Sequence, residues 1–321
     1  MSEDVGIDRD GATTAPSVVV VGSAARDLVD DDPRGWRLGG GVSYSALTTA
    51  RLGLRTGALV GVDEVASGAA EIELLRESGV DVRLVPLGHG PVFVNIERPG
   101  GRLQLCEDWS DAVPVDAVPA DWREAPGWIL APVAAELPAA WARLPSDGAF
   151  VAVGWQGLLR ELVPGEPTHH VPPHPDDIIA RADLVGLSRD DIERDVELVD
   201  LYRLLRPGAS LAVTHGDQGG LIVHGAHGSD MTELELRHYP AVPSHDPVDA
   251  TGAGDVFLAA LAAARIEPRL VGGRIRQGFD LLLAAAAASL VLEGPGMLGV
   301  PDRDAVRARM RETLRRVVPA Y

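Results

Sequence analysis

Two short segments of the chain are continuously apolar, without the alternation of a half-exposed strand. Residues 17–22 read SVVVVG and residues 56–62 read TGALVGV. A strand with no polar face has to be buried on both sides, which is typical of a parallel sheet covered by helices. Residues 42–52 have a helical pattern and end before Gly53, a typical helix C-terminus. The sequence therefore predicts βαβ units from its first strand onward.

Further short apolar segments continue this alternation along the chain. They lie at residues 128–131, 149–153, 183–187, 210–214 and 220–224, and helical patterns separate several of them. Strands alternating with helices indicate one α/β domain over residues 17–321, with a mainly parallel central sheet and helices on both of its faces. The acidic and polar residues 1–16 are predicted to form a disordered leader.

One pair of predicted strands interrupts the alternation. Residues 92–97 and 102–107 flank the turn Arg98-Pro99-Gly100-Gly101, a pattern typical of a β-hairpin. A hairpin does not fit among parallel crossovers, so we expect a small separate sheet from about residues 29–38 and 89–108. Such a sheet is suited to act as a lid over a cleft.

Charge and residue usage exclude several classes of function. The 321 residues carry 47 acidic and 29 basic side chains, a net charge of −18, which argues against nucleic acids and anionic membranes as partners. All the basic residues are arginine, so a lysine-containing P-loop and a Schiff-base lysine are both excluded. Cys106 is the single cysteine, so no internal disulfide forms, and a reducing, cytoplasmic location is expected.

The segment most informative about chemistry is Thr251-Gly252-Ala253-Gly254-Asp255, which directly precedes an apolar helix. The small residues allow the backbone to turn tightly and to approach a ligand closely. The unpaired N–H groups of this turn, together with the helix dipole, form an anion hole. Asp255 lies in the first helical turn, where a carboxylate either caps the helix or accepts a proton from an attacking hydroxyl.

The wider string DATGAGDVF resembles the C-terminal signature of the ribokinase (PfkB) family of carbohydrate kinases, D-T-x-G-A-G-D, with Ala250 in place of the usual threonine. The resemblance implies a ribokinase-like α/β fold with a small β lid, ATP as the phosphoryl donor and Mg²⁺. It also implies that Asp255 is the catalytic base and that Gly252, Ala253 and Gly254 supply the anion hole.

Two N-terminal segments extend the resemblance to the substrate side. GSAARD at 22–27 is similar to the first-strand motif G-x-x-x-x-D, which implies that Asp27 binds substrate hydroxyls. GGGVSYSA at 39–46 is similar to the N-terminal signature, which implies that Gly40 and Gly41 present backbone to the sugar. Tyr44 stands where that signature usually has asparagine, and its phenol is a further candidate for substrate binding.

Gln156 and Arg160 follow the strand predicted at 149–153, a position where open α/β sheets place ligand groups. Both side chains are candidates to bind a polyol or an anionic substituent. Their pattern, Q-G-x-x-R, is similar to an element of a branch of the family that includes inositol kinases. The alternative interpretation is a loop glutamine and a surface arginine without such a role.

Ser188 and Asp191 align with the family motif N-x-x-E, with both residues changed. The resemblance implies that Asp191 orders Mg²⁺ through water and that Ser188 lies at the ATP phosphates. Ser188 also reads as the N-cap of a helix over residues 189–205.

The remaining donor-side candidates lie in three glycine-containing loops. Thr214, Gly216 and Gly219 form a T-x-G-x-x-G pattern at a strand end, which in the family lies against ATP. Gly296 lies in a segment similar to the adenine-side loop. The resemblance further implies that Asp249 and Thr251 hold a monovalent cation such as K⁺.

Three functions are left open by the sequence. The first is a kinase acting on a small sugar or polyol, with inositol-like compounds favoured by Gln156 and Arg160. The second is a nucleoside kinase, which would need an apolar or aromatic slot for the base in the lid region. The third is a non-catalytic ribokinase-fold binding protein, which the changes at Tyr44, Ser188 and Asp191 favour and the intact GAGD opposes. In this family the small sheet serves either as a lid or as a clasp for a homodimer.

Overall fold

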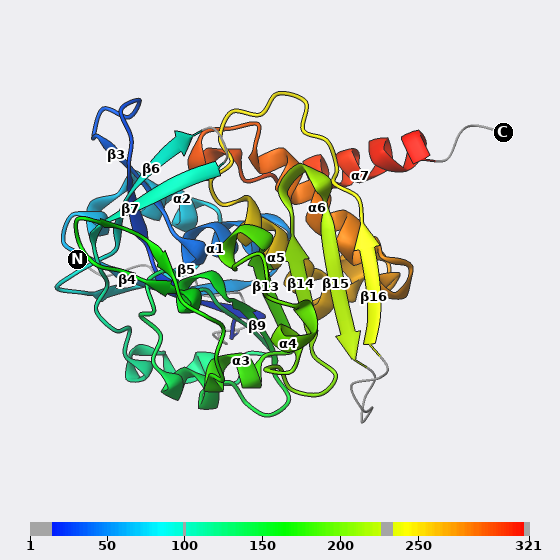
Figure 1. Cartoon of the computed structure of the whole chain (residues 1–321), viewed down its shortest axis with the longest axis horizontal. Coiled ribbons are helices and arrows are strands. Elements are labelled where there is room, and N and C mark those ends of the chain that lie inside the picture. The colour runs from blue at the N-terminus through cyan, green and yellow to red at the C-terminus, as the bar shows by residue number, and fades with distance from the viewer. Residues whose placement is uncertain (1–14, 99–100, 226–233, 318–321) are drawn as a thin grey trace, which may run out of the picture.

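The fold is built on one large sheet (Figure 1). The computed structural model describes residues 15–98, 101–225 and 234–317. Within these residues nine strands form the sheet, in the spatial order β16 (Leu234–Tyr239), β15 (Gly220–Gly225), β14 (Ser210–Thr214), β13 (Leu184–Ser188), β9 (Phe150–Gly154), β8 (Gly127–Leu130), β1 (Val18–Ser23), β4 (Thr56–Val62) and β5 (Asp81–Pro86). The predicted leader lies outside the described residues except for residues 15 and 16.

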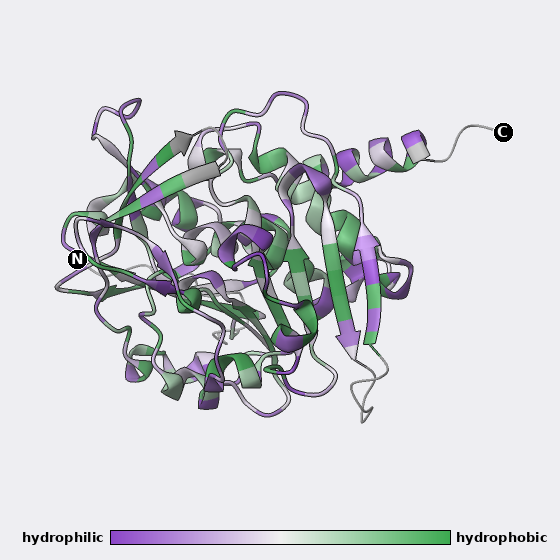
Figure 2. Ribbon diagram, in the orientation of Figure 1, coloured by the Kyte–Doolittle hydropathy of each residue, from purple (hydrophilic) through white to green (hydrophobic). Residues whose placement is uncertain are grey.

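The sheet is parallel from β5 to β14 and antiparallel at its far edge. Strands β15 and β16 pair antiparallel with β14 and with each other. β15 is mostly hydrophobic, whereas the edge strand β16 is largely hydrophilic (Figure 2). The predicted α/β class with a mainly parallel central sheet is confirmed, and β5 and β16 are additional strands at its two edges.

Helices cover both faces of the sheet. They are α1 (Gly41–Arg51), α2 (Ala70–Glu77), α3 (Asp177–Arg181), α4 (Leu198–Tyr202), α5 (Ala253–Ile266), α6 (Phe279–Val291) and α7 (Arg303–Val317). In β1, Val18 and Val20 face the core that contains α1, α2, α5, α6 and α7, while Val19 and Val21 face the core that contains α3 and α4. The continuous apolar run is therefore explained by burial on two sides. Among the described residues, no helix has the length and hydropathy needed to cross a membrane.

A second, five-stranded sheet stands apart from the large one and is called the lid here. Its order is β11 (Glu166–Pro167), β7 (Gly101–Asp108), β6 (Val92–Arg98), β2 (Ala25–Leu28) and β3 (Trp36–Gly39). Residues 99 and 100 of the predicted hairpin turn lie outside the described residues. Two ion pairs tie the lid to the body, Arg26 with Asp63 at 2.7 Å and Arg34 with Glu71 at 2.7 Å.

The helix expected over residues 189–205 is wrong in its extent. Ser188 caps only a single 3₁₀ turn, Arg189–Asp191, and the next helix, α4, begins at Leu198. The side chain of Asp191 turns back to accept the N–H of Ser188, and Ile192 then has extended backbone (φ −131°, ψ 151°). The capping box thus closes one turn without starting a longer helix.

Close packing fixes α5 on the sheet. A Cβ at Gly186 in β13 would lie 2.8 Å from Leu258 Cδ1, and one at Gly127 would lie 2.5 Å from Ile266 Cδ1. Glycine at these positions lets α5 approach the strands near its middle, at Leu258, and at its C-terminal end, at Ile266. The depth of α5 matters because its first turn carries Asp255.

We expect Gly186→Ala to lower the free energy of unfolding by about 1–3 kcal/mol, because its methyl group would collide with Leu258. Leu258→Ala should cost about 2–5 kcal/mol by leaving a cavity. The double variant should lose less than the sum of the two, because the smaller side chain makes room for the methyl group. Urea unfolding measures all three, and strictly additive losses would contradict this packing.

Candidate active site

The predicted turn lies at the start of α5, where the first N–H groups of a helix have no partner within the helix itself. Gly252 is the N-cap residue, in the left-handed region with φ 79°, and the helix begins at Ala253. A Cβ at Gly252 would lie 2.4 Å from the ring of Tyr44, so both conformation and packing require glycine here. A Cβ at Gly254 would meet no atom within 4 Å, so that face of the turn is open. The turn is therefore shaped to receive an anion.

The start of α1 lies opposite the start of α5. Gly40 has φ 87°, and a Cβ there would lie 2.7 Å from the carbonyl oxygen of Ser23. A Cβ at Gly41 would lie 2.9 Å from Asp255 Oδ1 and 3.1 Å from Ala131, which follows β8. The predicted substrate glycines and the predicted base thus border the same space, at the carboxyl ends of the parallel strands.

Asp255 is partly buried, and its Oδ1 faces Gly41 at the start of α1. Burial raises the pKa of its carboxyl to about 7, and the carboxylates of Asp191 and Asp27 raise it further, whereas the Arg160 guanidinium lowers it. The charges that act on Asp255 therefore come from three separate parts of the chain. A carboxyl group with a pKa near 7 is able to take up and release a proton at neutral pH.

Arg160, Gln156 and Asp191 form a polar cluster beside Asp255. Gln156 donates from Nε2 to Asp191 Oδ1 at 2.8 Å, and Arg160 Nη2 lies 3.8 Å from the same oxygen. Asp191 Oδ2 accepts the N–H of Ser188 at 2.8 Å. The structure thus brings a predicted Mg²⁺ residue and two predicted substrate residues into direct contact.

The lid contributes a chain of polar side chains on the substrate side. Asn95 in β6 donates from Nδ2 to Asp27 Oδ1 at 3.0 Å, and Gln104 in β7 donates to Asn95 Oδ1 at 2.9 Å. Asp27 itself lies in β2. Asn95 and Gln104 were not anticipated from the sequence, although two amides in otherwise apolar hairpin strands were a signal for a polar surface on the lid.

The predicted donor residues occupy the ends of two neighbouring strands. Ser188 in β13 and Thr214 in β14 are paired in register, and Thr214 donates to the carbonyl of Leu187 at 3.4 Å. Gly216 and Gly219 both have positive φ, 51° and 85°, in the turn that follows β14. The turn at residues 215–219 therefore begins next to Ser188, because Thr214 and Ser188 are paired at the ends of their strands.

Asp249 connects the turn before α5 to the loop after α6. Its Oδ1 accepts the N–H of Thr251 at 2.9 Å, and its Oδ2 accepts the N–H of Gly296 at 3.0 Å. Gly296 starts the 3₁₀ helix η10 (Gly296–Gly299), with φ 51°. Arg37 of β3 lies near the same carboxylate, with Nη1 3.7 Å from Oδ2. No sequence pattern pointed to Arg37 as a further residue of this site.

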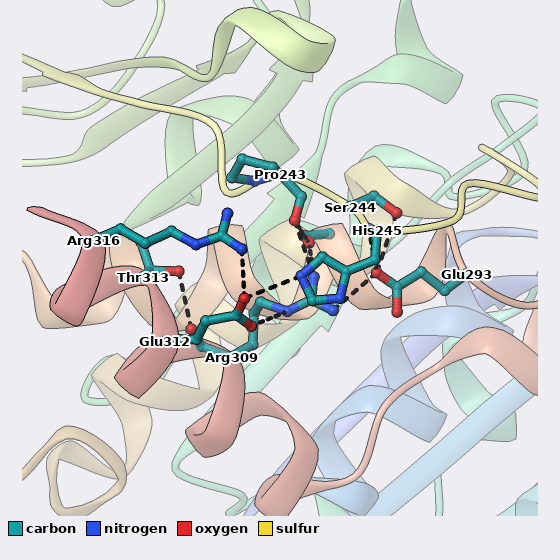
Figure 3. A network of polar contacts seen from close by, with 9 residues as sticks. Pro243, Ser244, His245, Glu293, Arg309, Glu312, Thr313 and Arg316 are labelled. Carbon is teal, nitrogen blue, oxygen red and sulfur yellow. Dashed lines mark hydrogen bonds and ion pairs between the residues drawn. The ribbon is translucent and has the colours of Figure 1, made fainter.

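A polar network holds the segment that leads to Asp249 (Figure 3). Arg309 of α7 is 5 % exposed and donates to the carbonyl of Pro243 at 3.1 Å and to Glu293 at 2.8 Å. Glu293 also accepts the N–H of His245 at 2.8 Å. The His245 ring lies 3.2 Å from Glu312. Loop 243–249 is therefore fixed to α6 and α7 on the side away from the lid.

The protein groups alone do not form a metal site. Among the described residues, no group of three or more His, Cys, Asp or Glu side chains is arranged to hold a metal ion. Both oxygens of Asp191 already accept hydrogen bonds from the protein. With both oxygens engaged, Asp191 would reach a Mg²⁺ ion on the donor phosphates through water and not directly.

The structure thus brings several of the predicted residues together around Asp255. Around Asp255 lie the start of α5 together with Asp27, Gly40, Gly41, Gln156, Arg160 and Asp191. Tyr44, the further candidate for substrate binding, is only 2 % exposed, and its ring packs against Gly252. The roles of all these residues in catalysis and binding stay predictions.

Comparison with known proteins supports the same fold. The model of the family "pfkB family carbohydrate kinase" matches residues 177–302, which contain Ser188, Thr214, the TGAGD turn and Gly296. A comparison with curated protein sequences finds no significant match.

Several solved structures are similar over nearly the whole chain. One is a pyrophosphate-dependent kinase in the ribokinase family complexed with a pyrophosphate analog and myo-inositol, with 17 % identity, a TM-score of 0.67, and coverage of 91 % of this chain and 99 % of that chain. A second is Arabidopsis thaliana ribokinase complexed with ribose and ATP, with 21 % identity, a TM-score of 0.65, and 92 % and 99 % coverage. A third is Giardia lamblia ribokinase, with 17 % identity, a TM-score of 0.70, and 94 % and 100 % coverage. The resemblance found in the sequence is therefore confirmed: the chain has the ribokinase fold, and its residues 177–302 match the model of the pfkB family of carbohydrate kinases.

Proposed function

We propose that the protein transfers the terminal phosphoryl group of ATP to a hydroxyl of a small sugar or polyol, with inositol-like compounds favoured. The observation that carries this proposal is the position of Asp255. Its carboxyl has a pKa of about 7, because burial disfavours the charged form, and it lies in the first turn of α5, facing the start of α1. A proton acceptor and an anion hole thus adjoin one another, which is the arrangement that phosphoryl transfer to an alcohol requires.

In the proposed reaction Asp255 accepts the proton of the acceptor hydroxyl. The hydroxyl oxygen bonds to the terminal phosphorus, and the bond from this phosphorus to its bridging oxygen breaks, leaving ADP. The N–H groups of residues 252–254 hold the phosphoryl oxygens as negative charge moves between them. Mg²⁺ bound to the donor phosphates would neutralise their charge and leave the acid–base step to the protein.

Arg160 has two tasks in this proposal. Its guanidinium lowers the pKa of Asp255, which keeps more of the base ionised at neutral pH. It also provides a positive charge at the site in a chain without lysine. A guanidinium remains charged even when it is partly desolvated, and the Arg160 side chain is only 10 % exposed.

The lid favours a polyol over a nucleoside. The lid side chains that extend from Asp27 are the amides of Asn95 and Gln104, joined by hydrogen bonds of 3.0 and 2.9 Å. Such a polar surface suits several hydroxyl groups, whereas a nucleobase needs an apolar or aromatic slot. The similar kinase complexed with myo-inositol agrees with this choice.

Two exposed apolar side chains favour ATP over pyrophosphate as the donor. Val248 and Leu298 are 66 % and 69 % exposed, and they flank the contact between Asp249 and Gly296. An adenine ring would cover such side chains, whereas pyrophosphate has no apolar part to do so. Both donors occur among the similar kinases, because one is pyrophosphate-dependent and another was solved with ATP.

We expect Asp255→Asn to lower kcat by about 10²- to 10⁴-fold while the KM for the acceptor changes little, because the amide accepts no proton. A coupled assay with a panel of inositols, sugars and nucleosides measures this loss. Asp304→Asn is the matched control, since Asp304 is also a first-turn acid but lies on α7 and is exposed. Full turnover by Asp255→Asn would rule out the proposed base.

The same variant should also be more heat-stable above pH 7. The folded pKa of Asp255, about 7, exceeds its ordinary value of 3.8, so the folded state prefers the protonated acid and loses stability as the pH rises from 4 to 7. Asparagine removes this loss. We expect Tm values that are equal near pH 4 and higher for Asp255→Asn at pH 8.

The pH dependence of kcat/KM should report the ionisation of Asp255. Activity should rise with pH and level off above about 7, because only the carboxylate accepts a proton. Arg160→Gln should move this rise to higher pH, since it removes a charge that lowers the pKa. Arg206→Gln, which changes an ion pair with Asp183 at the other end of β13, should leave the profile in place. A profile unmoved by Arg160→Gln would contradict the assigned charge effect.

The donor can be tested at the apolar side chains. Leu298→Asp should raise the KM for ATP about tenfold, because it puts a charge where the base would lie. The exposed Leu314 of α7 provides a control substitution, Leu314→Asp. An enzyme that uses pyrophosphate and ignores ATP would refute the donor assignment without affecting the role of Asp255.

A further inference from the structure

The Arg37 side chain connects the lid to the body beside the phosphoryl-binding turn. It extends from strand β3, where its Nη2 donates to Asp31 at 2.6 Å. Its Nη1 lies 3.7 Å from Asp249 Oδ2, and its Cδ would lie 3.6 Å from a Cβ at Gly296. The Arg37 side chain is 21 % exposed, so solvent screens this ion pair only in part.

Asp249 lies in a region with an excess of negative charge. The carboxylates of Asp27, Asp249 and Asp255 all act on the buried phenol of Tyr44, and together with burial they raise its pKa well above the ordinary value. Arg37 is the cation that acts in the opposite direction on the same phenol. A donor phosphate would add further negative charge. A fixed positive charge beside Asp249 therefore reduces the repulsion among these carboxylates.

A monovalent metal ion does not fit well at Asp249 in this chain. Its Oδ1 accepts the N–H of Thr251 and its Oδ2 accepts the N–H of Gly296. The Arg37 guanidinium already faces Oδ2, and a metal ion at the same oxygen would be repelled by it. Asp249 and Thr251, to which the resemblance assigns a monovalent cation, are both present. In this chain the Arg37 guanidinium from the lid is the counterion of Asp249.

We propose that Arg37 is the built-in cation of the Asp249 site, replacing a monovalent metal ion, and that its ion pair positions the turn before α5 when the lid is closed. Asp249 holds Thr251 and Gly296 through its two oxygens, so a charge that orders Asp249 also orders the backbone that leads to Gly252. Strand β3 packs against η10 at this point, which gives the lid a contact with the donor side. The kinetic part of this inference rests on the proposed function, and the cation site does not.

The test is thermal unfolding of the full chain in KCl and in tetramethylammonium chloride at equal ionic strength. Wild type should have the same Tm in both salts, because Arg37 leaves no place for K⁺. Arg37→Ala should be stabilised by K⁺ alone, by about 2 °C or more at saturation, because removing the guanidinium opens the site to a metal ion. The double variant Arg37→Ala/Asp249→Asn should lose that response, and Arg37→Lys should behave as wild type.

Activity gives a second, separate readout. Wild-type turnover should be the same in the two salts, whereas Arg37→Ala should turn over about tenfold more slowly in tetramethylammonium and recover with K⁺ or guanidinium ions. Arg34→Gln is the lid control, because Arg34 pairs with Asp32 and Glu71 and should produce no cation dependence. If Arg37→Ala does not fold, Arg37→Gln takes its place in both assays.

A K⁺-specific rise in the Tm of wild type would overturn the proposal, and so would an Arg37→Ala variant whose Tm ignores K⁺. Failure to find any phosphoryl acceptor would refute the proposed function instead, since the unfolding assay needs no substrate. The two claims can therefore fail independently.

Discussion

A carboxylate lies in the first turn of a helix, where the helix dipole favours anions, and the rest of the candidate site is arranged around it. The helix start alone would favour the ionised carboxylate by up to about 2 kcal/mol. The pKa of Asp255 is nevertheless raised from 3.8 to about 7, because burial and the carboxylates of Asp191 and Asp27 outweigh that effect. The fold thus disfavours the ionised form of the Asp255 carboxyl group. This group lies at the helix start where a phosphoryl group is expected to bind. Such a conflict is typical of functional sites and uncommon in purely structural ones.

Arginine side chains balance the negative charge from two directions. Arg160 lies with Gln156 and Asp191 beside the base, and Arg37 reaches from the lid to Asp249 on the donor side. In a chain of net charge −18 without lysine, these two guanidinium groups are the cations placed at the candidate site. They remain charged in partly desolvated surroundings, where a lysine would tend to lose its proton.

The sequence predicted the elements that local patterns determine. Residues 17–22 and 56–62 have to be buried on both faces, and the TGAGD turn has to precede a helix, so the parallel sheet and the start of α5 followed from them. Edge strands β5 and β16 were missed because their polar residues resemble a loop. The contacts of Arg37 with Asp249 and of Asn95 with Asp27 join residues 212 and 68 positions apart, and no local pattern reveals such pairs, whereas Asn95 and Gln104 face one another within the predicted hairpin. The same applies to the hydrogen bond between Asp191 and Gln156, which lie 35 positions apart. The predicted helix over residues 189–205 gives no sign of this contact.

The most direct measurement of the central claim is a titration of the Asp255 carboxyl group by ¹³C NMR, with the signal assigned by its absence in the asparagine variant. The account predicts a midpoint near pH 7 in the free protein, and a higher one when imidodiphosphate binds at the start of α5, because a second anion disfavours the carboxylate. A midpoint near 4 that the anion leaves unchanged would contradict it, since Asp255 would then be an ordinary helix-capping acid.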